Sequence, residues 1–157
     1  MKIVLISIGK TKKRYLLEEL EDYNSRINKY ISFDFIQLSK IKNTRNISIN
    51  ELLLIEGNLL LDNIKVSDYV ILLDDKGRSF TSMEFSKKVN SLMLSNRKRI
   101  VFLIGGAYGF SRDLYTRSNE NISMSKMTFS HQMVRVFFME QLYRSFTILN
   151  NEPYHNK

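Results

Sequence analysis

The chain of 157 residues contains no cysteine, no tryptophan and a single proline. The lack of cysteine excludes a disulfide framework, thiolate catalysis and a cysteine-ligated zinc site. No apolar run approaches the roughly 20 residues that a membrane-spanning helix needs. The apolar run that follows Met1 is interrupted at Ser7 and Gly9, too early for a signal peptide. We therefore expect a cytoplasmic protein without a membrane segment.

The charge balance is uneven, because 24 lysine and arginine residues outnumber 16 acidic residues and leave a net charge of +8. A surplus of this size favours an anionic partner, most often a nucleic acid. A lysine-rich surface that serves only solubility would have the same composition. The charge alone therefore leaves both interpretations open.

Short apolar runs rich in β-branched residues alternate with helical patterns along the chain. Strands are predicted at residues 2–8, 32–38, 68–73, 99–104 and 122–124, and helices at 15–30, 48–63, 81–95, 113–117 and 128–149. Ser48 with Glu51, and Thr81 with Glu84, have the spacing of capping boxes. Strands that alternate with helices favour a mostly parallel sheet in an α/β fold. Nothing resembles a linker, so we expect one domain over residues 1–157.

Three loops follow predicted strands, at the edge where parallel α/β sheets bind ligands. They are a predicted turn at residues 74–77, a glycine-rich loop at 105–109, and the segment after Met124. The glycine spacing matches neither the dinucleotide fingerprint nor a phosphate-binding P-loop. Taken alone, such a loop is more typical of a structural turn than of a ligand site.

Three ordered motifs together are more specific. The chain reads LDDKG at 73–77, FLIGGAYG at 102–109 and SKMTFSHQMVRVFFMEQLYRSF at 125–146, followed by Pro153-Tyr154-His155 near its end. These motifs resemble the SPOUT, or knotted-trefoil, methyltransferases that methylate a pseudouridine of large-subunit ribosomal RNA. The resemblance covers the whole chain. It implies an α/β fold with a mostly parallel sheet, flanking helices and a C-terminal trefoil knot, with S-adenosyl-L-methionine as the cofactor.

The resemblance places the cofactor in the three loops at the carboxyl edge of the sheet. It implies contacts from Leu73, Gly105, Gly106, Met124, Ser125, Lys126, Met127, Thr128 and Phe129. Backbone groups of such loops can read the edge of the adenine, and apolar side chains can enclose its ring. A methionine there would otherwise be interpreted as core filling. No metal is implied.

On the substrate side, the resemblance implies contacts from Arg135, Arg144, Tyr154 and His155. The residues also allow other roles, since a buried arginine needs a partner inside the protein and Arg144 could simply pair with Glu140. A histidine in a chain terminus is usually inert. His131, at the start of the last helix, is expected to be structural and to fix the loop above it. The general base is not identified.

The implied reaction is direct transfer of the sulfonium methyl to N3 of pseudouridine, in which the protein mainly positions the reactants. Members of the family act as homodimers, so a second copy would complete the RNA site, with the assembled ribosome as the substrate. Two alternatives remain. One is a non-catalytic RNA-binding α/β protein, and the other is an enzyme acting on small molecules, for which a charge of +8 would be unneeded.

Overall fold

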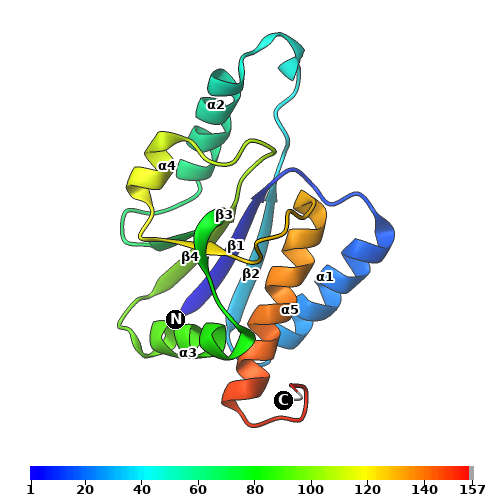
Figure 1. Cartoon of the computed structure of the whole chain (residues 1–157), viewed down its shortest axis with the longest axis vertical. Helices are drawn as coiled ribbons and strands as arrows, with labels where there is room; N and C mark the ends of the chain where they lie inside the picture. Colours follow the sequence, from blue (N-terminus) through cyan, green and yellow to red (C-terminus); the bar gives the residue numbers. More distant parts are fainter. Residues whose placement is uncertain (156–157) are drawn as a thin grey trace.

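The structure, a computed structural model, describes residues 1–155 of the chain. Helices flank a five-stranded sheet (Figure 1). The strands are β1 (Lys2–Ile8), β2 (Ser32–Leu38), β3 (Tyr69–Ser79), β4 (Arg99–Ile104) and β5 (Glu120–Ser123). The helices are α1 (Arg14–Ile27), α2 (Ile49–Leu61), α3 (Ser82–Leu94), α4 (Arg112–Arg117) and α5 (His131–Leu149), with a 3₁₀ turn at Thr44–Asn46.

All strand pairings are parallel, and the strand order in the sheet is β2-β1-β4-β3-β5. The inner strands β1 and β4 are buried on both sides, which explains their continuous apolar sequences. Alternate residues of β1 belong to two cores. Ile3 and Leu5 pack with α1, α3 and α5, whereas Val4 and Ile6 pack with α2 and α4. The predicted α/β fold with a mostly parallel sheet and flanking helices is confirmed.

The prediction of a turn that ends the third strand at residues 74–77 is wrong. β3 continues to Ser79, and its pairing with β5 shifts register, so that Leu73 and Arg78 both lie opposite Ile122. A Cβ atom at Gly77 would lie 2.6 Å from backbone atoms of Asn121 and Ile122. The later strand therefore passes directly against the backbone of this segment, and only glycine leaves room for that approach.

The helix starts follow the capping signals in the sequence, with one exception. The capping boxes at Ser48 and Thr81 are confirmed, and Ser111 caps α4. The last helix was predicted from residue 128, but it begins at His131. The cap is Ser130, whose hydroxyl oxygen accepts a hydrogen bond from the N–H of Met133 at 3.3 Å. The two residues before it are thereby left in the loop that follows β5.

α5 runs along the sheet, from the carboxyl ends of the parallel strands toward their amino ends. Its first turn lies at the carboxyl edge, and its last turn lies at the opposite edge (Figure 1). Residues 150–155 then fold back beside the helix end, where the N–H of Glu152 donates to the carbonyl of Thr147 at 2.8 Å. Within residues 1–155, no helix is both long and apolar enough to cross a membrane.

Candidate functional site

A cavity of about 360 Å³ opens at the ends of β4 and β5, beside the middle of β3. The three predicted loops meet there, and eight of the nine predicted cofactor residues line the cavity: Leu73, Gly105, Gly106, Met124, Ser125, Met127, Thr128 and Phe129. Lys126 is the exception and does not contribute to the lining. The structure thus brings together residues that are up to 56 positions apart in the sequence.

The loop after β4 forms one wall of the cavity through its backbone. The N–H of Gly109 donates to the carbonyl of Gly106 at 3.3 Å, which closes the loop on itself. A Cβ atom at Gly106 would lie 2.3 Å from Oε2 of Glu56, which belongs to α2. Glycine is therefore required at position 106 by the packing behind the loop. Any larger residue must displace either the carboxylate or the cavity wall.

The loop after β5 forms the opposite wall and is held by its own side chains. The hydroxyl of Ser123 donates to the carbonyl of Ser125 at 2.8 Å, and the hydroxyl oxygen of Ser125 accepts from the N–H of Met127 at 3.0 Å. The ring of Phe129 packs on that of Phe137 in α5, with centroids 4.7 Å apart. These contacts fold the loop back over the start of α5 and leave Met127 74% exposed.

Two acidic residues of β3 bring negative charge to the cavity. The hydroxyl of Tyr115 in α4 donates to Oδ2 of Asp74 at 2.6 Å. Burial acts to raise the pKa of Asp74, but the hydrogen bonds from Tyr115 and from the N–H of Lys76 outweigh it and lower that pKa. Burial and the bond to Asp74 raise the pKa of Tyr115. Asp74 is thus ionised near neutral pH, and the neighbouring Asp75 also lines the cavity.

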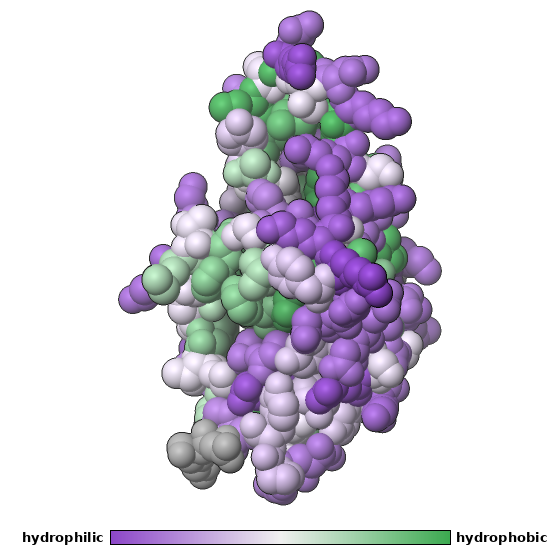
Figure 2. All heavy atoms as spheres, turned by 90° about the vertical axis from the view of Figure 1, so that its right-hand side faces the viewer, coloured by the Kyte–Doolittle hydropathy of each residue, from purple (hydrophilic) through white to green (hydrophobic). Residues whose placement is uncertain are grey.

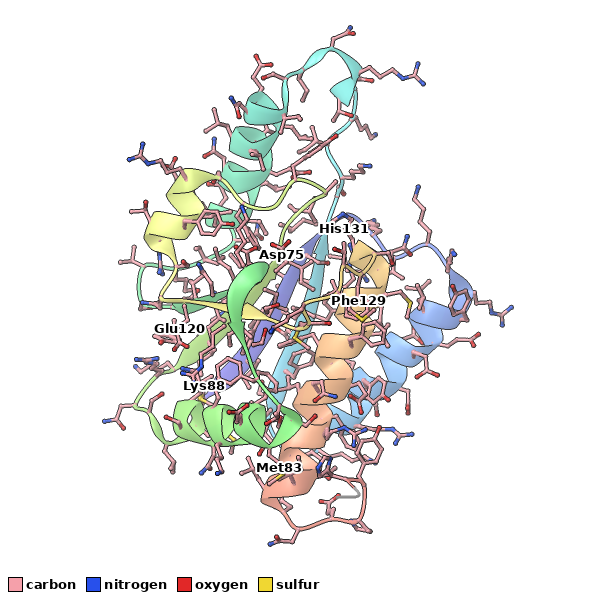
Figure 3. All side chains as sticks on the ribbon, in the orientation of Figure 1. Asp75, Met83, Lys88, Glu120, Phe129 and His131 are labelled. Carbon is pink, nitrogen blue, oxygen red and sulfur yellow. The ribbon has the colours of Figure 1, made fainter. Side chains whose placement is uncertain are left out.

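His131 lines the cavity from the first residue of α5. Burial lowers the pKa of its imidazole, and the positive charges of Arg135 and Lys40 lower it further. The ring is therefore neutral near pH 7. Figure 3 shows His131, Phe129 and Asp75 gathered at the carboxyl end of the sheet, beside the start of α5.

Arg135 lies away from the cavity mouth, with only 2% of its surface exposed. Its guanidinium donates to the carbonyl of Ile8 at 2.7 Å, to the hydroxyl of Thr11 at 2.8 Å and to Oε1 of Gln37 at 3.2 Å. These bonds tie α5 to the ends of β1 and β2. The predicted contact between Arg135 and a substrate does not fit this placement, because no part of the guanidinium faces solvent.

The other three predicted substrate residues meet at the far end of α5. The ring of Tyr154 packs edge-on against Tyr143 with centroids 4.9 Å apart, and the guanidinium of Arg144 lies 4.7 Å from the centre of the Tyr154 ring. Arg144 also pairs with Glu140 and lies 3.3 Å from Nδ1 of His155. Arg144 lies 13 residues after His131 in α5, so the cluster lies about 20 Å along the helix from the cavity of the same chain.

Sequence reasoning missed several residues of the site. Asp74 was assigned to a turn, and nothing in the sequence connects Tyr115 or Glu56 with the cavity. Tyr115 lines the cavity, and Glu56 lies behind its wall at Gly106, because α2 and α4 pack on the same side of the sheet. Within residues 1–155, no group of three or more acidic or histidine side chains is placed to hold a metal ion.

A family model described as “Predicted SPOUT methyltransferase” matches residues 1–155. Three relatives, each called ribosomal RNA large subunit methyltransferase H, align over all 157 residues and over their own full lengths. They come from Flavobacterium psychrophilum, Parabacteroides distasonis and Christiangramia forsetii, with 50%, 49% and 48% identity. The chain therefore belongs to the SPOUT methyltransferase family, whose fold includes a trefoil knot.

Proposed function

We propose that the protein transfers a methyl group from S-adenosyl-L-methionine to N3 of a pseudouridine in large-subunit ribosomal RNA, on the assembled ribosome. The observation that carries the proposal is the cavity at the ends of β4 and β5, beside the middle of β3, which is lined by eight residues of the expected cofactor set. The relatives of the same length, all named as methyltransferases of large-subunit ribosomal RNA, support this substrate class.

The residues of the cavity fit the proposed cofactor. Its volume of about 360 Å³ falls within the range of roughly 300–1,000 Å³ that small-molecule sites occupy. The backbone at Gly105 and Gly106 permits close approach of a planar base, and Leu73, Met124 and Met127 provide apolar surface around it. The ionised Asp74 suits a ligand that carries positive charge. When bound, the cofactor supplies an electrophilic methyl group.

The loops after β1 and β2 supply the surface that suits RNA. Six basic residues are exposed there, namely Lys10, Lys12, Lys13, Lys40, Lys42 and Arg45, and residues 9–13 and 39–48 contain no acidic residue. The N–H of Lys12 donates to Oε1 of Gln132 at 3.1 Å, so this surface adjoins the start of α5. Figure 2 shows mostly hydrophilic residues on this side of the molecule. We call these loops the basic loops.

Methylation at N3 requires that the imide proton of the base be lost. Two side chains at the cavity are in a form that accepts a proton: the ionised carboxylate of Asp74 and the neutral imidazole of His131. A positioned base contributes about 10²–10⁴-fold to a reaction rate. The larger share of the rate would come from holding the nitrogen in line with the methyl group.

The distance between the two ends of α5 favours a homodimer. The tail cluster of Arg144, Tyr154 and His155 lies about 20 Å along the helix from its own cavity. A second copy packed with its α5 in the opposite direction would bring its tail to that cavity. Partly exposed apolar residues near the start of α5, including Phe129 and Phe137, line a second cavity of about 310 Å³ that such a copy would cover.

We expect light scattering at micromolar concentration to give a mass close to twice the 18.5 kDa of one chain. A mass near 18.5 kDa would contradict the dimer.

The function is tested with ribosomes from cells that lack this protein. The purified protein and labelled S-adenosyl-L-methionine are added to whole ribosomes, to isolated large subunits and to free ribosomal RNA, and the nucleosides are then analysed by mass spectrometry. We expect one methylated pseudouridine, formed fastest on whole ribosomes. Cofactor binding without RNA methylation would favour a small-molecule substrate. Failure to bind the cofactor in calorimetry would favour a non-catalytic RNA-binding protein.

A further inference from the structure

We propose that Glu56, which lies outside the cavity, is a positioning residue of the cofactor loop. Its carboxylate acts through Gly106 and favours the positively charged methyl donor over the neutral thioether product. The inference rests on the proposed function, because it concerns the same cavity. It goes further by assigning a role to a side chain that neither the motifs nor the cavity lining include.

The first observation is the contact between Glu56 and Gly106. Glu56 lies in the middle of α2 and is 5% exposed. A Cβ atom at Gly106 would lie 2.3 Å from its Oε2, 2.6 Å from its Oε1 and 2.7 Å from its Cδ. The whole carboxylate therefore lies against Gly106, whose backbone lines the cavity. Only Gly106 therefore separates the carboxylate of Glu56 from the cavity.

The second observation is that α2 is fixed to the same loop at a neighbouring position. A Cβ atom at Gly57 would lie 2.3 Å from the hydroxyl oxygen of Ser111, the residue that caps α4 at the end of the loop. Gly57 is itself buried. Because the helix backbone is pressed on Ser111, the backbone of Glu56 is held close to the loop that contains Gly106. The position of the carboxylate is set by the packing of the helix.

The third observation is that this buried carboxylate has no hydrogen-bond partner. Oε2 of Glu56 is fully buried and unpaired among residues 1–155. Burial raises the pKa of Glu56, and the positive charge of Lys40 in the loop after β2 opposes that rise. An unpaired buried carboxylate is costly, and an apolar side chain of similar size would stabilise the fold more. A glutamate at this position is therefore better explained by ligand binding than by stability.

The charge difference between donor and product gives this carboxylate a role. The donor carries a positive sulfonium, whereas the product that remains after methyl transfer has a neutral sulfur, and the two are otherwise nearly identical. A negative charge acts across one residue of protein with little screening, because the interior has a low effective dielectric constant. Glu56 would thus strengthen binding of the donor and leave binding of the product almost unchanged. Product release after each turnover would follow from this difference.

The charge is tested by replacing Glu56 with glutamine, which keeps the shape of the side chain. Calorimetry measures the dissociation constants of S-adenosyl-L-methionine and S-adenosylhomocysteine for the wild-type protein, Glu56→Gln and Asp62→Asn. Asp62 is an exposed acid at the end of the same helix, so the control loses the same charge. We expect the preference for the donor to fall at least about fivefold in Glu56→Gln and to stay unchanged in Asp62→Asn.

An unchanged preference in Glu56→Gln would overturn the proposed role of the charge. An equal loss in Asp62→Asn would overturn it as well, because net charge would then explain the effect. If the wild-type protein binds neither molecule, the proposed function itself fails, and the two failures are thereby distinguished. Thermal unfolding gives an independent readout. Glu56→Gln should unfold at the same or a higher temperature, whereas a structural role predicts a lower one.

The contact with Gly106 is tested by a double-mutant cycle. Gly106→Ala places a Cβ atom against the carboxylate and should weaken donor binding roughly tenfold, as expected when a tightly packed neighbour is displaced. Combining it with Glu56→Ala removes the obstacle, so the double variant should bind the donor about as well as Glu56→Ala alone. Additive losses would overturn the claim that Glu56 acts through Gly106.

Discussion

The two ends of α5 are built from different chemical groups. Around its first turn, part of the cavity wall is formed by backbone and small residues, as at Gly105, Gly106 and Ser125. Around its last turn, large side chains contact one another, as Tyr143, Arg144 and Tyr154 do. Substitutions that add atoms should therefore disrupt the cavity at the first turn of α5. Substitutions or deletions that remove side chains should disrupt the cluster at the other end. About 20 Å of helix separates His131 at the cavity from Arg144 in the tail cluster of the same chain.

The tail end is also anchored by hydroxyl groups that keep their protons. The hydroxyl of Tyr30 donates to both carboxylate oxygens of Glu152 at 2.7 Å, and this bond, together with partial burial, raises the pKa of Tyr30 to about 12. Burial, followed by the bond to Tyr154, raises the pKa of Tyr23 as well. The anchoring therefore does not change with pH in the neutral range. In the proposed dimer, the tail would meet the partner's cavity as a folded cluster.

Deleting residues 154–157 should have the largest effect on methylation. Tyr154 can stack on an unpaired base and His155 can hydrogen-bond it. Because base stacking is worth about 1–3 kcal/mol per base, we expect methyl transfer to ribosomes to fall at least roughly a hundredfold. Cofactor affinity should change little, since the cavity residues end at Val134. Full methylation by the truncated protein would show that the tail has no role in the reaction.

Gly106→Val should have the next largest effect, at the other end of α5. The branched side chain must occupy space within 2.3 Å of the Glu56 carboxylate or enter the cavity. We expect the affinity for S-adenosyl-L-methionine to fall at least tenfold, which corresponds to about 1.4 kcal/mol. Ser67→Val is the control, because it adds the same side chain to an exposed position before β3. Unchanged affinity in a folded Gly106→Val protein would remove this loop from the site.

Mixing the Gly106→Val protein with the truncated protein tests whether the two ends of α5 act together across a dimer. Gly106→Val keeps a complete tail, and the truncated chain keeps a complete cavity. If the tail of one copy serves the cavity of the other, a mixed dimer contains one intact combination of the two. We expect exchange of subunits to restore methylation to about a quarter of the wild-type rate, from statistical mixing of two sites per dimer. No recovery would show that the tail acts within its own chain.

The fold was largely predictable from local signals in the sequence. The buried runs of β1 and β4, and the capping boxes at Ser48 and Thr81, depend on neighbouring residues and were placed correctly. The path of the chain after Leu73 was predicted wrongly, because it depends on pairing with β5, which is more than 40 residues away. The glycine at position 77 looks like a turn residue. Its actual requirement, close passage of another strand, has no local signature.

The site was predictable only where motifs mark it. The loop residues at 73, 105–106 and 124–129 came from resemblance to a family, and the structure gathers all of these except Lys126 around one cavity. Arg135 shows the limit of that reasoning, because a motif does not distinguish a buried arginine from one that faces a ligand. Glu56 shows the converse. Its sequence neighbours describe an ordinary helix, and its importance comes from a tertiary contact.

Charge removal in the basic loops should have the smallest of these effects. Lys12 and Lys42 are exposed, and they follow β1 and β2 at the edge of the sheet that carries the cavity. We expect Lys12→Gln with Lys42→Gln to lower kcat/KM on ribosomes about three- to tenfold at low salt, because each lysine neutralises a phosphate and releases counterions. Cofactor affinity should stay unchanged, since neither side chain lines the cavity.

The dependence of kcat/KM on salt concentration distinguishes phosphate contacts at the basic loops from attraction of RNA by net charge. Removing phosphate contacts should reduce the slope of log kcat/KM against log salt by about 1–2 for the pair. Lys65→Gln with Lys98→Gln removes the same charge from exposed positions that precede β3 and β4, at the opposite edge of the sheet. This control should keep both the wild-type slope and the wild-type rate. If it matched the Lys12 and Lys42 variant, RNA would be attracted by net charge alone, and the basic loops would have no special role at the cavity end of α5.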